Sequence, residues 1–258
     1  MDTQTDNRVA AKIALKEALK LCDGDTNNEI VAKAIARLVA INTTLAPAQS
    51  DALQFGNWRL ISAPNFPDGQ KREDGKYEYT LGRLAFNIFE PTDLKLVIDR
   101  VFQPVFSLEE AGKLSHDIIV EFTIIDERAK NLQGIIKNRG QAFASDDRTL
   151  QVKFTGAELF PLNSEEDPQK MQVWLNVFDI KKRDKTVNLG KTIQLFLAKL
   201  LFGVQLPSSV DRKTGKLSFT MSRSPEGGLE TIYLDSELRI TRSTKKKTVL
   251  VCEKNTNE

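Results

Sequence analysis

Apolar and polar residues alternate with a period of two along most of the chain after residue 55, and this pattern predicts β-strands. Leu96 and Ile98, for example, fall on one side of a segment that places Lys95 and Asp99 on the other. Turn and breaker residues separate such segments, which favours an antiparallel meander. We predict strands at residues 55–61, 76–89 with a break near 81–82, 94–106, 116–126, 132–143, 149–160, 171–180, 217–221, 229–235, 238–242 and 248–252.

Apolar residues before the strands recur with helical spacing in two stretches, residues 8–21 and 29–41. Thr26 is the expected N-cap of the second stretch, with Glu29 at the third position as in a capping box. The two stretches predict a helical hairpin within residues 1–50, in front of a β domain at 51–254. The hairpin is expected to pack against the sheet as a brace or plug; the alternative is a partner-binding surface.

A run that is apolar nearly all round, Asn188–Gly203, predicts one helix inserted before the last strands. A buried core helix is the favoured interpretation, and the alternative is a lid over the barrel mouth or a foot that dips into lipid. Three adjacent lysines follow at an expected hairpin tip, where they form either a solvated turn or a contact with an anionic membrane. The candidate residues for membrane contact are Phe196, Leu197, Phe202, Lys245, Lys246 and Lys247.

Composition narrows the classes of function. Lys+Arg 37 against Asp+Glu 35 leaves a net charge of +2, so we expect no nucleic-acid partner. Cys22 and Cys252 stand far apart, which argues against a disulfide framework and favours a reducing compartment. His116 is the only histidine, so a multi-histidine metal site is excluded; we expect this residue at the surface.

The first nine residues are polar and lack the apolar segment of a secretory signal. We therefore expect the chain as given to start in the compartment where it is made, or to lack its targeting segment. No stretch approaches the roughly 20 apolar residues of a membrane-spanning helix.

Two motifs lie at opposite ends of the β region, Phe-Gly-Asn-Trp-Arg-Leu at 55–60 and Tyr-Leu-Asp-Ser-Glu-Leu-Arg-Ile-Thr-Arg at 233–242. If the sheet closes on itself, the first and last strands meet, and Arg239 can stack on Trp58. In the alternative interpretation Trp58 is an ordinary core residue and Arg239 an exposed charge. Asp235 is expected to support the same end, or to pair with Arg239 or Arg242.

Together these segments resemble the plastid lipid-associated proteins, also called fibrillins, of plastids and cyanobacteria (not the extracellular matrix proteins of that name). The resemblance also includes Asn-Thr-Thr-Leu-Ala-Pro at 42–47, residues 81–89 and residues 101–105, and its most specific part is the block at 233–242. The sequence departs from the family after Arg242, where a basic run replaces the usual glycine, and residues 163–185 have no clear counterpart.

The resemblance implies a mainly β, lipocalin-like antiparallel barrel that binds isoprenoid quinones, carotenoids or acyl lipids and contributes to photoprotection. It also implies a location on the cytoplasmic face of thylakoids or at lipid globules of a cyanobacterium, or in the stroma or plastoglobules of a plastid. The family's motifs map onto Gly56, Trp58, Tyr233, Asp235 and Arg239, and these are the residues that we expect to close the barrel, because they lie on the first and last strands.

Ligand contact is expected from inward aromatic side chains nearer the open end, because phenyl rings offer a long apolar ligand wide contact surfaces. The candidates are Tyr79, Phe86, Phe89, Phe102, Phe122, Phe143 and Phe154. No phosphate loop, nucleophile elbow or metal-ligand spacing is present in the sequence, so we expect neither a cofactor nor catalysis. Two alternatives remain: a tetrapyrrole-binding chaperone or lyase using Asp99 or Glu121, and a coat protein of lipid particles without a pocket.

Overall fold

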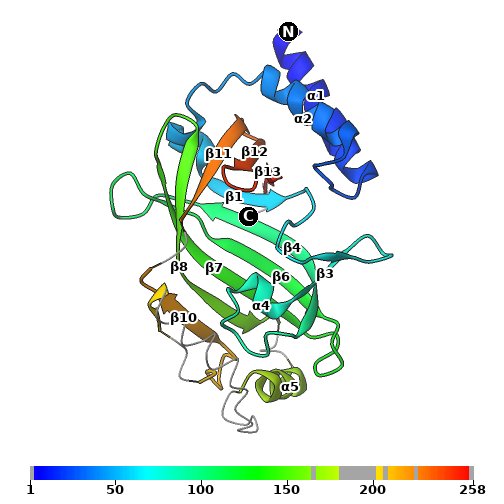
Figure 1. Cartoon of the computed structure of the whole chain (residues 1–258), viewed down its shortest axis with the longest axis vertical. Coiled ribbons are helices and arrows are strands. Elements are labelled where there is room, and N and C mark those ends of the chain that lie inside the picture. The colour runs from blue at the N-terminus through cyan, green and yellow to red at the C-terminus, as the bar shows by residue number, and fades with distance from the viewer. Residues whose placement is uncertain (1–2, 164–166, 180–201, 206–208, 224–225, 256–258) are drawn as a thin grey trace.

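The computed structural model describes residues 3–163, 167–179, 202–205, 209–223 and 226–255. Within this part of the chain eight strands form a closed antiparallel barrel, in which each strand pairs with the next and the last pairs with the first (Figure 1). Trp58 on the first strand lies opposite Lys254 on the last, so the predicted meeting of first and last strands is confirmed. The eight are β1 Gly56–Leu60, β4 Lys95–Val105, β6 Ile118–Ile124, β7 Gln133–Ala144, β8 Thr149–Pro161, β11 Glu226–Leu234, β12 Leu238–Ser243 and β13 Val249–Lys254.

Shorter strands extend this barrel: β2 Gln70–Lys71, β3 Tyr77–Thr80, β5 Leu114–Ser115, β9 Val204–Gln205 and β10 Leu217–Met221. β8 changes partners along its length, because residues 149–153 pair with β11 whereas residues 156–159 pair with β10. At the change, a Cβ on Gly156 would lie 2.2 Å from the backbone oxygen of Phe219, so the close approach of β10 requires glycine there. β8 and β11 therefore diverge toward one end of the barrel (Figure 1).

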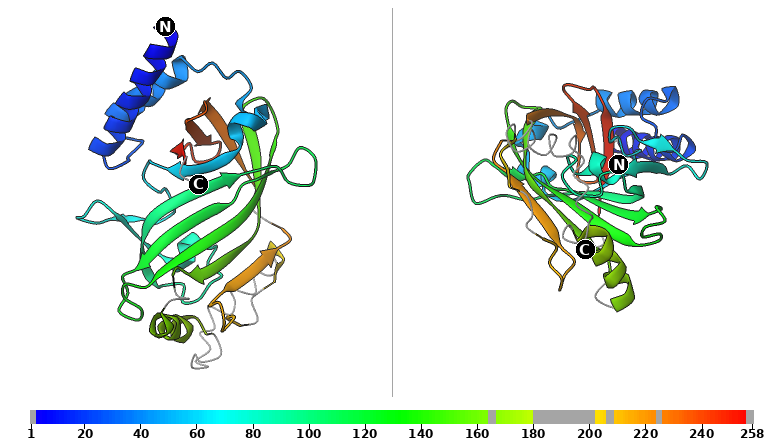
Figure 2. Two further views of the ribbon diagram at one scale, coloured as in Figure 1. Left: turned by 180° about the vertical axis from the view of Figure 1, so that it is seen from behind. Right: turned by 60° about the horizontal axis from the view of Figure 1, so that its bottom comes forward.

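Helices α1 Thr3–Leu21 and α2 Glu29–Ala40 form the predicted hairpin, which lies outside the barrel next to β11, β12 and β13 (Figures 1 and 2). The N-cap of α2 is Asn28, whose side chain accepts a hydrogen bond of 2.9 Å from the Ile30 amide, and not Thr26. The hydroxyl of Thr26 instead donates to the Val249 carbonyl at 3.1 Å and ties the hairpin to β13. Buried apolar residues join hairpin and wall: Ala11, Leu15, Leu19, Val31, Ile35 and Leu38 with Ile232, Tyr233, Leu238, Ile240 and Val251.

Residues 42–55 cross one end of the barrel, which we call the closed end. They include the turn η1 Pro47–Gln49 and the short helix α3 Asp51–Gln54. The Thr44 hydroxyl donates to the Leu234 carbonyl at 2.7 Å, and the Ala48 amide donates to the Asp147 carbonyl at 3.0 Å. These bonds fasten the segment to the end of β11 and to the turn between β7 and β8.

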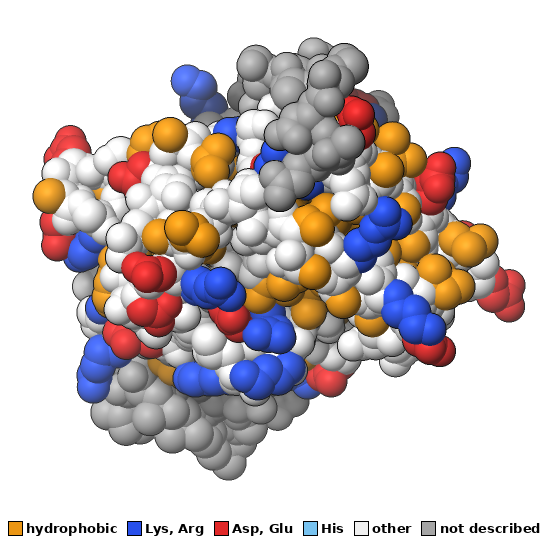
Figure 3. Space-filling model, turned by 90° about the horizontal axis from the view of Figure 1, so that it is seen from above, with side chains coloured by type: hydrophobic (Ala, Val, Ile, Leu, Met, Phe, Trp, Pro, Cys, Tyr) orange, Lys and Arg blue, Asp and Glu red, His pale blue; other side chains and the backbone are white. Residues whose placement is uncertain are grey.

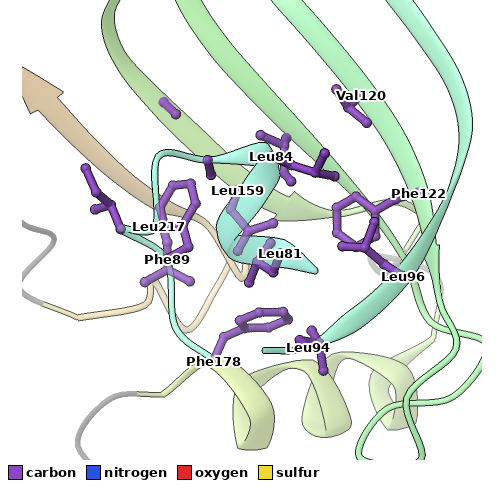
Figure 4. Close-up of a cluster of buried hydrophobic side chains, with 14 of the residues drawn as sticks. Leu81, Leu84, Phe89, Leu94, Leu96, Val120, Phe122, Leu159, Phe178 and Leu217 are labelled. Carbon is purple, nitrogen blue, oxygen red and sulfur yellow. The ribbon is translucent and has the colours of Figure 1, made fainter. Parts of the chain in front are cut away.

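The opposite end is filled by residues 81–94, which we call the plug, beginning with α4 Leu81–Leu84 (Figure 4). The predicted strand at 76–89 is therefore wrong after Thr80. Asn138 on β7 donates a buried hydrogen bond of 3.0 Å to the Leu84 carbonyl and holds the plug against the wall. Apolar side chains of plug and wall form the main core: among others Leu81, Leu84, Phe89, Leu94, Leu96, Val120, Phe122, Leu159 and Leu217.

The prediction of a strand at 171–180 is wrong, because α5 Pro168–Phe178 is a helix beneath the plug. Asp167 caps it by accepting hydrogen bonds from the amides of Gln169 and Lys170, with Pro168 in the first turn. Trp174 and Phe178 are one turn apart and are both fully buried against the main core. The predicted strands at 217–221, 229–235, 238–242 and 248–252 correspond to β10–β13, whereas most of the apolar run at 188–203 lies outside the described residues.

Candidate functional site

The closed end contains the predicted stacking contact. The guanidinium carbon of Arg239 lies 4.9 Å from the centroid of the Trp58 ring, and both side chains are at most 1 % exposed. Trp58 donates its indole hydrogen to the Gln54 carbonyl at 2.7 Å, and Arg239 donates to the Gln103 side-chain oxygen at 2.5 Å. Burial lowers the pKa of Arg239 while the neighbouring Cys252 acts in the opposite direction, and an arginine remains charged in any case. The alternative of an exposed Arg239 is wrong.

Asp235 does not pair with Arg239 or Arg242, contrary to the alternative considered from the sequence. Its carboxylate accepts hydrogen bonds from the Tyr233 hydroxyl at 2.7 Å and forms an ion pair with Lys12 of α1 at 3.0 Å. Burial acts to raise the pKa of Asp235, but the hydrogen bonds from Tyr233 and from the turn amides outweigh it and lower that pKa. The motif at 233–238 therefore shapes the β11–β12 turn and fastens α1.

Gly56 stands where the chain enters the closed end. Its φ of +136° lies in a region that side chains rarely adopt, and a Cβ there would lie 2.4 Å from Cε of Lys254. The positive φ therefore favours glycine at this position, whereas the flexible Lys254 side chain could move away from a Cβ.

His116 is buried, only 4 % exposed, so the expectation of a surface residue is wrong. Burial and the positive charge of Arg239 lower its pKa to about 3, which leaves the imidazole neutral at physiological pH. Among the residues that the structure describes, no group of three His, Cys, Asp or Glu is placed to hold a metal ion.

Five of the seven candidate aromatic residues belong to or pack against the main core. Tyr79, Phe89 and Phe122 are fully buried in it. The Tyr79 hydroxyl donates to the Pro64 carbonyl at 2.5 Å, and burial raises its pKa to about 12. Only Phe86 of the plug and Phe154 of β8 are half-buried, with ring centroids 5.4 Å apart.

Phe86 has an unusual backbone conformation. Both Phe86 and Asn87 have φ of +56°, in the left-handed region where a bulky side chain is uncommon. The Asn87 amide donates to the Gly82 carbonyl at 2.8 Å, which closes the turn after α4. This turn places the Phe86 ring 6.4 Å from the ring of Phe219, in addition to its contact with Phe154. Local strain of this kind is often found at functional positions.

Phe102 and Phe143 do not join this group, which corrects the expectation that they point inward. The strand pairing shifts by one residue between Ile98 and Arg100, so Phe102 faces outward beside Arg100, whose guanidinium carbon lies 5.8 Å from its ring. Phe143 follows the buried Ala142 near the end of β7 and is 46 % exposed. A bulge that the sequence pattern does not reveal thus inverts one face of β4.

The candidate membrane contacts have different outcomes. Phe196 and Leu197 lie outside the described residues, and Phe202 packs half-buried against the main core. Lys245, Lys246 and Lys247 are exposed at the β12–β13 turn, where the Lys245 ammonium donates to the Glu226 carbonyl at 3.0 Å. On the face seen in Figure 3, acidic and basic side chains are interspersed with hydrophobic ones. No helix in the described part of the chain is long and apolar enough to cross a membrane.

The sequence did not single out three residues that shape the interior: Gln103, Asn138 and Phe219. The first two are buried polar residues within strands, and each makes a hydrogen bond to a group far away in sequence. No local signal identifies such long-range partners. Phe219, on β10, stacks edge-on against Phe89 at 5.2 Å.

No family model, no curated protein and no solved structure matches the chain.

Proposed function

We propose that the protein binds a small hydrophobic molecule inside the barrel, between the plug and the inner wall where β8 and β11 diverge. The observation that carries this proposal is the pair Phe86 and Phe154, which meet at 5.4 Å and stay half-buried while the core around them is fully buried. Leu229 on β11 is half-buried as well and packs with Phe154 against a small cluster near the closed end. Apolar surface that folding leaves accessible on the inner wall is suited to an apolar ligand.

Binding fits these residues better than catalysis. The side chains around Phe86 and Phe154 offer apolar contact area. The buried ionisable groups Arg239 and His116 instead lie near one another at the closed end, where Arg239 stacks on Trp58. The resemblance to plastid lipid-associated proteins supports isoprenoid quinones, carotenoids or acyl lipids as the ligand class. It also supports a place at thylakoids or lipid globules, with a role in photoprotection.

The test is saturable binding of an isoprenoid quinone or a carotenoid by the purified protein, measured as ligand retained through gel filtration. We expect about one ligand per chain. Phe154→Glu should abolish retention, because a carboxylate on the inner wall would have to be desolvated against the ligand. Phe143→Glu is the matched control, because it introduces the same charge in place of an exposed phenylalanine on the neighbouring strand β7.

Each other outcome selects a different function. Equal retention by wild type and Phe154→Glu would exclude the inner site. Failure to retain any isoprenoid, together with coating of liposomes, would favour a coat protein. A new visible absorption band on mixing with a bilin would favour the tetrapyrrole alternative.

A further inference from the structure

A cavity of about 470 Å³ lies outside the barrel where three separate segments meet. They are the end of α1, the connection that follows β1, and the turn between β2 and β3 (Figure 1). Two contacts fix this junction: the Ala63 amide donates to the Gly24 carbonyl at 2.9 Å, and Lys71 pairs with Asp23 at 2.8 Å. We call it the junction pocket.

The junction pocket has an apolar part. Leu19 of α1 and Ile98 of β4 are buried in it, and Ile61 and Tyr77 are half-buried. The Tyr77 ring lies nearly parallel to that of Tyr79, with centroids 6.4 Å apart, which fixes its orientation. A flat ring beside aliphatic groups is suited to a small apolar or aromatic body.

The charges around the junction pocket do not balance. Lys16, Lys20, Arg59 and Lys76 line it, against the two carboxylates of Asp23 and Glu253.

Glu253 forms ion pairs with two cations at once: Lys16 binds one of its carboxylate oxygens at 2.8 Å, and Arg59 binds the other. Lys20 makes no ion pair within the described residues.

The other charges of the pocket are neutralised from outside it, since Asp23 pairs with Lys71 and Lys76 pairs with Asp99 at 3.3 Å. An excess of two positive charges remains, from Lys20 and from the pair of cations that share Glu253. An anion of about two charges matches this excess, and a phosphate monoester carries −1.5 to −2 at neutral pH.

We propose that the junction pocket binds a phosphate monoester attached to an apolar or aromatic body. The phosphate contacts Lys20 together with Lys16 or Arg59, and the body lies against Tyr77 and Ile61. A soluble phosphorylated metabolite and the headgroup of phosphatidic acid share this chemistry. The site lies outside the barrel and does not depend on the proposed hydrophobic ligand.

Phenyl phosphate and inorganic phosphate are the probes, titrated into the full chain by calorimetry at low salt. Phenyl phosphate should bind more tightly than inorganic phosphate, because only the former covers Tyr77 and Ile61. Lys20→Gln should weaken its binding about threefold to fivefold, the effect of one exposed charge pair. Lys33→Gln, which removes an exposed lysine from α2, should leave it unchanged.

Equal affinity for the two probes, or equal effects of the two lysine variants, would overturn the proposal. Vesicles with and without phosphatidic acid distinguish the source of the phosphate. Binding of phenyl phosphate together with selective binding to the vesicles that contain phosphatidic acid supports the lipid headgroup, and binding of phenyl phosphate alone supports a soluble phosphorylated compound. Binding of neither overturns the proposal. Phe154→Glu should bind phenyl phosphate normally, so that failure of the interior site and failure of the junction pocket are told apart.

Discussion

The Arg239 guanidinium stacks on the Trp58 indole at 4.9 Å, fully buried and without an ion pair to any described carboxylate. Among the described residues, its polar partners include the Gln103 side chain and the Cys252 thiol. A buried charge costs several kcal/mol of desolvation, which here is offset by a ring face and polar groups and not by an opposite charge. The stability of the closed end therefore depends more on this buried pair than it would on an exposed cation–π contact.

Removing the charge tests that dependence. Arg239→Ala should lower the free energy of unfolding by about 3 kcal/mol, because it removes the stacking contact and leaves a cavity. It also leaves the buried Gln103 oxygen without its hydrogen-bond donor. Urea unfolding followed by tryptophan fluorescence measures the change. Arg100→Ala is the matched control: its guanidinium lies over Phe102 at 5.8 Å on the outer surface and should cost less than about 1 kcal/mol. Equal losses would refute the special role of burial.

His116 predicts how stability responds to pH. The folded protein holds the pKa of this residue at about 3, whereas the unfolded chain has an ordinary value of about 6.5. The unfolded state therefore binds more protons between these values. The contribution of His116 to the free energy of unfolding is therefore fully present above about pH 6.5. It is lost as the pH falls below that value, by about 1.4 kcal/mol per pH unit.

The measurement is urea unfolding at several pH values between 7.5 and 5, for wild type and His116→Gln. Other groups titrate in both proteins, so the difference between the two isolates His116. Wild type should lose stability more steeply on acidification than the variant. Parallel curves over this range would mean that the imidazole is solvated and not buried.

Asp235 predicts how the helical hairpin is attached. Asp235→Asn removes one of the two carboxylate charges that Lys12 meets, the other being Glu237, and weakens the acceptor of the Tyr233 hydroxyl. Amides of α1 should therefore exchange with deuterium faster, while those of β4 and β6 do not. Glu29→Gln, which breaks the exposed pair with Lys33, should leave exchange unchanged. Uniform acceleration across the barrel would contradict a local attachment.

The sequence predicted those features that depend on short-range patterns. Period-two alternation together with the turn and breaker residues between segments located the strands of the barrel, although the strand at 116–126 is apolar on both faces. Helical periodicity located the hairpin, because side-chain direction follows directly from backbone geometry. The contact of Trp58 with Arg239 was predictable because closure of an antiparallel sheet brings its first and last strands together.

What the sequence did not reveal depends on long-range contacts. The helix at 168–178 has strand-like β-branched and aromatic residues, although Asp167 followed by Pro168 is a helix-start signal that would have identified it. The outward turn of Phe102 results from a bulge, and the burial of His116 from strands that close over it. Neither the bulge nor the burial of His116 can be read from the local pattern of apolar and polar residues.

Two glycines of the barrel wall predict opposite effects of the same substitution. A Cβ on Gly140 would lie 2.3 Å from the His116 carbonyl oxygen, a backbone atom held by the hydrogen bond from the His116 amide to the Gly140 carbonyl at 2.8 Å. Neither group can turn aside as a flexible side chain would. Gly140→Ala should therefore lower the free energy of unfolding by about 1–3 kcal/mol, as overpacking does.

A Cβ on Gly227 of β11 meets nothing within 4 Å. Gly227→Ala should raise stability by about 0.5 kcal/mol, because alanine restricts the unfolded chain more than glycine does. Thermal and urea unfolding of the two variants compare the signs directly. If Gly227→Ala lowered stability and Gly140→Ala left it unchanged, the β5–β6 connection would not pack closely against β7. The burial of His116, which depends on that packing, would then be contradicted.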